Sequence, residues 1–272
     1  MTKPLAARIA LYVVLIVGAV IMVFPFVWTV VTSLTPGATL TTTPRLVPEN
    51  PSLSPYIELF DRVPFARVIG NSLLIAVVST LLQLVTSAMA AYVFARVPFP
   101  GRGALFVLYL ATMMIPFQVL IVPLFAEMKT LGLINTYAGA ILPTIATAFG
   151  VFLLRQAITT VPYDLDQAAT LDGAGHFRIF VQIILPLIRP ALATLAVFAF
   201  LNTWNSFLWP LIILRDPLMQ TLPVALTSLQ GQYSTQWDVL MAGSVISIIP
   251  MFALYVFAQK YIVQGVAGAG LK

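Results

Sequence analysis

Long stretches without a charged residue limit what this chain can fold into more than any other feature of its sequence. Stretches of about 20 residues or more, the length a helix needs to cross a membrane, lie at 9–44, 68–95, 103–126, 130–154, 190–214, 217–237 and 239–259. Charged residues make up 8% of the chain, whereas a soluble domain carries about 25%. We therefore expect an integral membrane protein.

Composition reduces these stretches to six predicted spans. The stretch 217–237 holds two prolines and four glutamines, so we expect a polar loop there. In the stretch 9–44 the apolar part ends near Val31, and we expect only short helices in the proline-rich residues 34–67 that follow. The sequence thus predicts one all-α transmembrane domain over residues 1–272, with spans near 9–33, 69–95, 104–126, 136–157, 183–210 and 239–262.

Charges in the connecting segments predict how the chain is oriented. Nine basic and three acidic residues lie in the segments 1–8, 96–103, 155–189 and 260–272, whereas the segments on the other side hold five basic and six acidic residues. Cytoplasmic segments carry the excess of Lys and Arg. We therefore expect both termini in the cytoplasm, and we attribute the net charge of +5 to orientation and not to nucleic-acid binding.

Missing residue types exclude several classes of protein. The chain has no Cys and a single histidine, His176, so we expect no metal site. No Asp, Glu, Lys or Arg lies in the middle of a predicted span, although carriers driven by protons or ions usually need one there. The spans also lack paired carboxylates and nucleophile–base pairs, so we expect no catalytic residue and no intramembrane enzyme.

The longest cytoplasmic connection, residues 161–182, is predicted to contain two short helices. Asp164 and Asp166 fall in the first turn of the first helix, where the helix dipole favours negative charge. Asp172-Gly173 ends this helix, because Gly173 can adopt a left-handed conformation and Asp172 can cap the second helix.

Small and aromatic residues in this connection are unusual for a solvated loop. Ala168 and Ala169 give the first helix a small face, and His176, Phe177 and Phe180 follow on the second. One interpretation is a solvated connector. The pattern favours the other, in which the loop presents its alanines and aromatic residues to a groove on a partner protein.

This segment resembles the signature loop of ATP-binding-cassette (ABC) importer permeases, which reads Glu-Ala-Ala, three residues, Gly, nine residues and Ile-x-Leu-Pro. Here the loop gives Gln167-Ala168-Ala169, then three residues, Gly173, nine residues and Ile183-Ile184-Leu185-Pro186. The one departure is Gln167, which replaces the family glutamate.

Two further segments are similar to carbohydrate-uptake permeases. Residues 202–211, Asn-Thr-Trp-Asn-Ser-Phe-Leu-Trp-Pro-Leu, resemble the fifth span of that type. The end of the chain, 259–272, and the connection 96–102 are similar to the smaller permease subunit of the maltose transporter. The resemblance covers the chain from about residue 68 to its end.

The resemblance implies a type I ABC importer permease fold and a role in sugar uptake across a prokaryotic inner membrane. A second permease subunit would complete a heterodimer, and two ATP-binding subunits would consume ATP and Mg²⁺. An extracytoplasmic solute-binding protein would deliver a di- or oligosaccharide or a related glycoside. This chain would contact membrane lipid and would bind no cofactor and no nucleic acid.

Four groups of residues receive roles from the resemblance. The coupling surface for the ATPase would be Gln167, Ala168, Ala169, Asp172, Gly173, Ala174 and Phe177. The tail that reaches the ATPases would include Gln264, Gly265, Gly268, Gly270 and Lys272. The loop that faces the binding protein would centre on Gly231, Gln232 and Tyr233, although it also fits a plain polar connector. Asn202, Trp204 and Asn205 are candidates to line the pathway, but helix packing explains them better, because Asn can bond between helices and aromatic residues such as Trp209 populate the membrane interface.

Two questions stay open at this level. A channel or facilitator that works alone is the second hypothesis, and it predicts solute flux through liposomes that hold this chain without ATP. The sugar is not identified, although the lack of Arg and Lys inside the spans disfavours a phosphorylated substrate.

Overall fold

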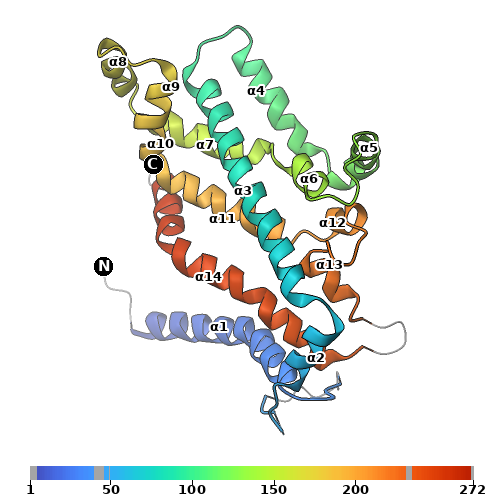
Figure 1. Cartoon of the computed structure of the whole chain (residues 1–272). Helices are drawn as coiled ribbons and strands as arrows, with labels where there is room; N and C mark the ends of the chain where they lie inside the picture. The colour runs from blue at the N-terminus through green and yellow to red at the C-terminus, as the bar shows by residue number, and fades with distance from the viewer. Residues whose placement is uncertain (1–4, 40–45, 49, 231–234, 271–272) are drawn as a thin grey trace. The chain divides into compact units, whose positions relative to one another are not determined.

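A computed structural model describes residues 5–39, 46–48, 50–230 and 235–270, and almost all of this part is helical (Figure 1). The α-helices are α1 (Leu5–Ser33), α2 (Ser54–Arg62), α3 (Phe65–Arg96), α4 (Arg102–Ala111), α5 (Phe117–Thr130), α6 (Tyr137–Ile141), α7 (Ala148–Thr160), α8 (Asp164–Leu171), α9 (His176–Ile179), α10 (Leu185–Leu187), α11 (Arg189–Trp204), α12 (Leu208–Ile213), α13 (Leu222–Thr227) and α14 (Trp237–Gly270). Among these residues extended pairing is limited to one isolated bridge. The all-α prediction is confirmed.

Three single helices have the length and composition of a membrane span. They are Arg8–Ser33, Phe65–Arg96 and Trp237–Gln259, and they overlap the predicted ranges 9–33, 69–95 and 239–262. The other apolar regions are pairs of helices that meet the same criteria only together: Arg102–Met114 with Phe117–Thr130, Tyr137–Thr144 with Ala148–Thr160, and His176–Leu187 with Arg189–Trp204. The described residues therefore hold three to six spans.

Prolines lie at or beside the break in the first and third of these pairs. The first pair bends by 97° at Ile115 and Pro116, where Ile115 is extended. The third bends by 79° beside Pro186 and Pro190, and a π-helical turn, η3 (Phe180–Ile184), precedes it. Proline lacks an N–H and its ring clashes with the carbonyl four residues earlier, so it removes one hydrogen bond of the regular ladder and favours a bend or a break. Pro25 in α1, Pro123 in α5 and Pro250 in α14 lie inside helices that continue past them.

The predicted polar loop at 217–237 contains a helix that composition alone did not indicate. In α13 Leu222, Val224 and Ala225 are almost fully buried. The Ser72 hydroxyl accepts a hydrogen bond from the N–H of Leu222 at 2.6 Å. The polar residues of this stretch therefore surround a short buried segment.

The chain divides into two compact units. Unit 1 comprises residues 1–66 and 225–250, and unit 2 comprises 67–224 and 251–272. Within unit 1 the N–H of Gly37 donates to the Asp238 carboxylate at 2.7 Å, and the hydroxyls of Ser33 and Tyr56 lie 2.9 Å apart. These contacts join the last residue of α1 to α2, and the segment after α1 to the start of α14.

Small side chains allow α3 to pack closely inside unit 2. A buried stripe of Ala76, Ser79, Ser87 and Ala91 runs along α3. The α7 residue Gly150 approaches this stripe so closely that a Cβ atom there would collide with the Ser87 hydroxyl. Close approach through small residues is the usual way in which helices associate in lipid.

Trp209 differs from its predicted place at the membrane interface. Its side chain is 2% exposed and packs with Ile75, Met128 and Ile213. The indole N–H donates to the carbonyl of Gly139 at 3.2 Å, which ties α12 to α6. An interfacial tryptophan keeps its polar edge at the lipid headgroups, whereas this one finds its acceptor inside the protein.

Candidate coupling surface and polar cavity

The segment that carries the signature motif forms two short helices, α8 and α9, joined at Gly173. The N–H of Ala174 donates to the carbonyl of Ala169 at 2.9 Å, and the N–H of Gly173 donates to the carbonyl of Thr170 at 3.0 Å. This pair of bonds is the Schellman motif, which needs a left-handed residue after the helix. Gly173 has φ of +80°, so the prediction for this glycine is confirmed.

Two details of the predicted loop are wrong. Asp172 is the C-cap of α8 and not the N-cap of the next helix, because the left-handed Gly173 turns the chain and Gly175 precedes α9. Phe180 is buried against Tyr92, with ring centroids 5.1 Å apart, and is therefore not exposed. It falls in the π-helical turn, which rotates it toward the core of unit 2.

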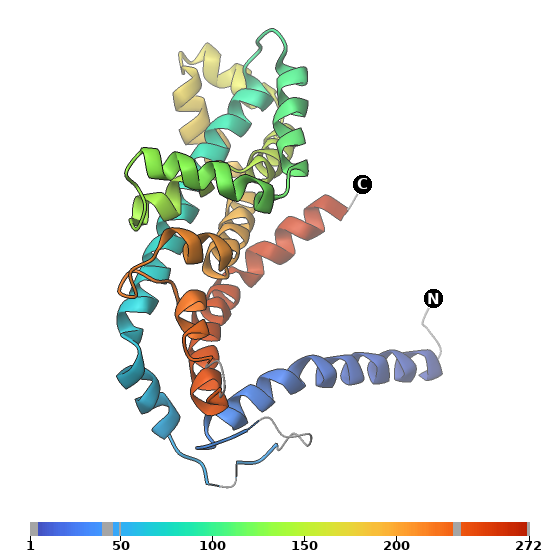
Figure 2. The same ribbon diagram turned by 90° about the vertical axis from the view of Figure 1, so that its right-hand side faces the viewer.

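Most of the residues predicted for the coupling surface lie exposed on α8 and α9. Gln167, Ala168, Asp172, Gly173 and Phe177 are exposed, and Ala169 and Ala174 are half-buried. Figures 1 and 2 show α8 and α9 at the end of unit 2 where α3 ends and α4 begins. The signature residues thus share one end of this unit.

Two large apolar side chains stand out on this surface. Leu171, the last residue of α8, is 89% exposed, and Phe177 of α9 is 79% exposed. Sequence reasoning selected Phe177 but not Leu171. The signal was present, because Leu171 follows Gln167 and Ala168 at the spacing that places all three on one face of a helix.

A buried ion pair attaches this surface to α3. The Nε of Arg96 lies 2.7 Å from a carboxylate oxygen of Asp166, and both side chains are 8% exposed. Arg96 also donates to the carbonyl of Val161 at 2.7 Å, and its guanidinium lies 5.5 Å from the centre of the Tyr163 ring. One side chain at the end of α3 therefore holds the beginning of the connection 161–182, which we call the coupling loop, at three places.

The ion pair is close but incompletely satisfied. Within the described residues neither carboxylate oxygen of Asp166 receives a well-aligned hydrogen bond. Burial raises the pKa of the Asp166 carboxyl above its usual range, and the positive charges of Arg96 and then His176 oppose that rise. The carboxylate thus depends on Arg96 for its charge, and sequence reasoning had no signal for this long-range contact.

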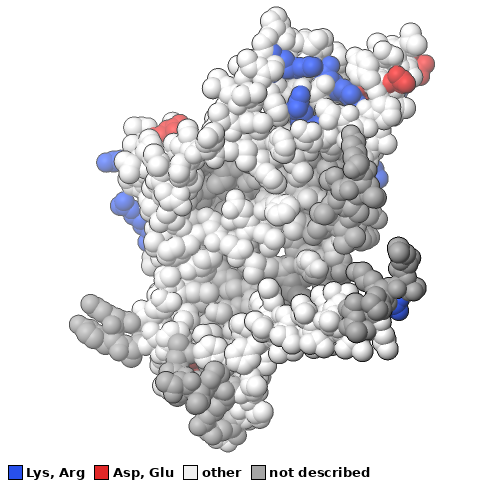
Figure 3. Space-filling view, turned by 180° about the vertical axis from the view of Figure 1, so that it is seen from behind, with Lys and Arg blue, Asp and Glu red and all other residues white. Residues whose placement is uncertain are grey.

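The charged side chains of unit 2 gather in two places. Around the start of the coupling loop, Arg155 donates to the carbonyl of Phe94 and lies 4.2 Å from the centre of the Phe106 ring. Elsewhere the Arg215 guanidinium lies over the ring of Phe125, and the backbone N–H of Arg215 donates to the side-chain oxygen of Asn135. Figure 3 shows basic groups at separate ends of this unit with an uncharged surface between them. The side of the membrane on which each group lies stays a prediction.

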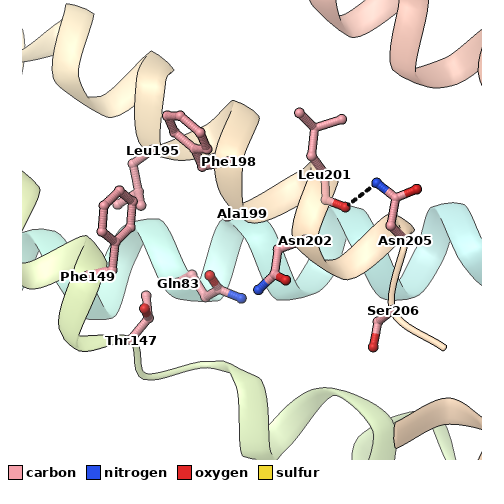
Figure 4. A pocket seen from close by; sticks show the side chains of 10 residues that line it. All are labelled: Gln83, Thr147, Phe149, Leu195, Phe198, Ala199, Leu201, Asn202, Asn205 and Ser206. Atoms are coloured by element: carbon pink, nitrogen blue, oxygen red, sulfur yellow. Dashed lines mark hydrogen bonds between the residues drawn. The ribbon is translucent and has the colours of Figure 1, made fainter. Parts of the chain in front are cut away.

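A pocket of about 620 Å³, which we call the polar cavity for its amide and hydroxyl groups, opens at the surface of unit 2, and two of the three pathway candidates line it (Figure 4). Asn202 near the end of α11 and Asn205 just after it both face the cavity. Trp204 does not line it: its ring is 3% exposed and stacks on Phe200, with centroids 5.7 Å apart. Gln83, which also lines the cavity, was missed because it stands alone in an apolar span.

Two of the predicted groups fall partly or wholly outside the described residues. Gly231, Gln232 and Tyr233 lie outside them. In the tail, the backbone of α14 continues through Gly270, but the side chains after Gln259 and the whole of Lys272 lie outside the described part. In the described residues no group of His, Cys, Asp and Glu has the arrangement of a metal site.

Comparisons with known proteins match most of the chain. Residues 83–268 match the family model described as binding-protein-dependent transport system inner membrane component. The arabinooligosaccharides transport system permease protein AraQ of Bacillus subtilis is 37% identical, over 97% of this chain and 96% of that protein. The sn-glycerol-3-phosphate transport system permease protein UgpE of Rhizobium meliloti is 35% identical over the same shares of the two chains.

A solved structure shares the fold. A chain of a bacterial ABC transporter involved in the import of the acidic polysaccharide alginate superimposes with a TM-score of 0.84, covering 96% of this chain and 99% of that one at 24% identity. This likeness establishes the fold of an ABC importer permease for the chain as a whole.

Proposed function

Because the chain belongs to the family of binding-protein-dependent transport system inner membrane components, we propose that it forms, with a second permease, the pathway of an ATP-driven sugar importer. It is a multi-pass inner-membrane permease of the carbohydrate-uptake ABC type. Two ATP-binding subunits would supply the energy from ATP and Mg²⁺, and an extracytoplasmic solute-binding protein would deliver the substrate.

The observation that carries the proposal is the exposed apolar edge of the coupling loop. Leu171 and Phe177 leave most of their surface uncovered at a charged end of unit 2. A large apolar side chain gains about 1.5–3 kcal/mol when it is fully buried. A groove on an ATP-binding subunit would cover both side chains, with Ala168 and Ala169 allowing close approach to the backbone of α8.

The contacts of Arg96 would allow this surface to transmit a movement to the membrane spans. Arg96 fixes the start of the coupling loop to the end of a helix that is long enough to span the membrane. A push on α8 would therefore reach α3 directly and would favour one of two packings of the spans, as in other rigid-body switches.

A neutral sugar is the substrate class that the chain supports best. The AraQ relative transports arabinooligosaccharides by name, whereas the UgpE relative is named for a glycerol phosphate. A phosphate needs Arg or Lys donors, and the residues that line the polar cavity include neither. We therefore propose a di- or oligosaccharide or a related glycoside.

The remaining roles complete the proposal. Both termini would lie in the cytoplasm, with the coupling loop on the same side. The tail with Gln264, Gly265, Gly268, Gly270 and Lys272 would reach the ATP-binding subunits. Gly231, Gln232 and Tyr233 would face the solute-binding protein on the other side. The charge distribution and the maltose-type resemblance of the tail support these assignments.

Charge substitutions at two exposed leucines test the proposal. Leu171 ends α8, and the 58% exposed Leu131 follows α5 on the side that we assign to the exterior. Leu171→Asp should weaken co-purification of the ATP-binding subunit and lower ATP-dependent uptake by about tenfold or more, because a buried leucine is worth one to two decades of affinity. The matched change Leu131→Asp should leave the bound ATP-binding subunit unchanged.

Two outcomes would contradict the proposal. If the Leu171→Asp variant and the wild type recovered the same amount of ATP-binding subunit, α8 would not be the surface that binds this subunit. Sugar flux through liposomes that contain only this chain, without ATP, would instead identify a facilitator.

A further inference from the structure

The middle of α3 carries a polar side chain that faces the polar cavity. Gln83 lies near the centre of this span and is 5% exposed as a whole residue. In the described part of the chain its side-chain amide makes no hydrogen bond with the other lining residues. Because the cavity is open, this amide contacts whatever fills it, and water or a polar ligand satisfies the amide better than an apolar one.

Two asparagines extend this polar lining. Figure 4 shows the side chain of Asn202 pointing toward that of Gln83 across the cavity, and no hydrogen bond within the described residues ends on the Asn202 amide. The amide nitrogen of Asn205 donates to the carbonyl of Leu201 at 2.8 Å, which leaves its oxygen available as an acceptor. Together the three carboxamides offer both donors and acceptors.

The rest of the lining is aromatic, small or hydroxylic. Phe149 and Phe198 meet edge to face, with ring centroids 5.9 Å apart, and Thr147 and Ser206 add hydroxyl groups. None of the ten lining residues is charged. The volume of about 620 Å³ falls in the range of about 300–1,000 Å³ that is typical of small-molecule sites.

A sugar has the chemistry that matches this lining. Its vicinal hydroxyls each donate and accept, as the carboxamides do, and its C–H face packs against aromatic rings. An ionised ligand would find no opposite charge, and an apolar ligand would leave the carboxamides without partners.

We propose that Gln83, Asn202 and Asn205 form a subsite on this chain that binds the hydroxyl groups of a neutral sugar as it crosses the membrane. The inference rests on the proposed function and adds direct substrate contact by this subunit. It also gives Gln83, a residue with no counterpart in the sequence motifs, a part in substrate recognition.

The competing explanation is that the carboxamides only hold α3 against α11. Asparagine and glutamine do bond between helices in membranes, and a small movement would join Gln83 to Asn202. In that case their loss would lower the stability of the importer whether or not sugar is present, and would not change its response to sugar.

The test uses the complete importer reconstituted in proteoliposomes with its binding protein. The probes are arabinobiose, lactose, maltose and cellobiose, with sn-glycerol 3-phosphate as the anionic probe. The variants are Gln83→Met and Asn202→Leu, and the matched control is Gln156→Met, which makes the same change at an exposed position of α7. Uptake below the KM, ATPase stimulation by the loaded binding protein, and thermal stability of the purified importer with and without probe are measured.

We expect each cavity variant to lower uptake of the imported disaccharide by about tenfold, the effect of one or two lost hydrogen bonds. ATPase stimulation should persist, and the rise in Tm that the disaccharide gives the wild type should vanish in the variants but not in Gln156→Met.

Three results would overturn the inference, and they are distinguishable. If both cavity variants took up sugar like the wild type and kept the sugar-dependent rise in Tm, the subsite proposal would be wrong and the proposed function would stand. If the importer carried sn-glycerol 3-phosphate and none of the disaccharides, the proposal of a neutral sugar as substrate would be wrong. A wild-type importer that moves no probe with ATP would overturn the proposed function, and the subsite with it.

Discussion

Arg96 contacts a carboxylate, a carbonyl and an aromatic ring that all belong to the coupling loop. Removing the arginine alone leaves Asp166 buried without a counter-charge, and breaking a buried pair in this way costs about 3–5 kcal/mol. Removing the carboxylate alone is milder, because Arg96 keeps the carbonyl of Val161 and the ring of Tyr163.

These contacts predict an order of damage among variants. Arg96→Met should lower the thermal stability of the assembled importer and its uptake the most, and Asp166→Asn less. The double variant Arg96→Met/Asp166→Asn should recover most of the stability that Arg96→Met loses, because no buried charge remains. Thermal unfolding of the four purified importers measures this. Costs that simply add in the double variant would show that the two side chains do not interact.

Gly173 gives a second prediction at the scale of one residue. Its left-handed backbone costs a β-branched residue about 1–2 kcal/mol, whereas asparagine tolerates it. Gly173→Asn should therefore retain ATP-dependent uptake, and Gly173→Val should lose much of it.

The matched control for Gly173 is Gly103→Val, because both glycines have open space around them and only Gly173 has a positive φ. Equal uptake by the valine and asparagine variants at position 173 would show that the turn is not required.

Single residues also show where sequence reasoning succeeds. Gly173 was predicted because its conformation is a local property, set by neighbours that the sequence displays. The pairing of Arg96 with Asp166 was not, because it depends on how two distant segments meet. The same holds for Gln83, whose environment is made by α7 and α11.

At the scale of elements, prolines lie at the breaks of two bent pairs, but they do not by themselves distinguish a bent pair from a single span, because Pro25 lies inside α1 and Pro250 inside α14. Length and charge identified the apolar ranges, but the range 104–126 contains Pro116 and the range 183–210 contains Pro186 and Pro190. These prolines were visible in the sequence, but the sequence alone did not show which proline ends a helix and which proline a helix accommodates. The buried helix α13 was harder to predict from the sequence, because the glutamine-rich residues around it make the whole stretch look polar.

The contact between α3 and α7 predicts the effect of added volume. Gly150→Ala should destabilise the importer by about 1–3 kcal/mol, the usual cost of overpacking. Ser87→Gly should recover part of that loss in the double variant, because the Ser87 hydroxyl is the atom that a new Cβ would strike first. Thermal unfolding of both single variants and the double variant completes the cycle. An unchanged Tm for Gly150→Ala would contradict the close approach of the helices.

At the scale of the whole molecule, the absence of cysteine makes orientation directly measurable. In a chain with no Cys, Leu171→Cys and Leu131→Cys each introduce one exposed thiol. Expressed without the ATP-binding subunit, Leu131→Cys should react with a membrane-impermeant maleimide in intact spheroplasts, and Leu171→Cys only in inside-out vesicles. The reverse pattern would contradict the cytoplasmic assignment of the coupling loop.

The Arg96–Asp166 ion pair also has a consequence for how such chains diverge. If either partner changed alone, the intermediate would carry a lone buried charge, and selection would act against it. The two codons should therefore change together or stay as they are, so that positions 96 and 166 covary among descendants of a common ancestor. Surface positions such as Leu131 should drift independently, and the pair would persist as one inherited unit.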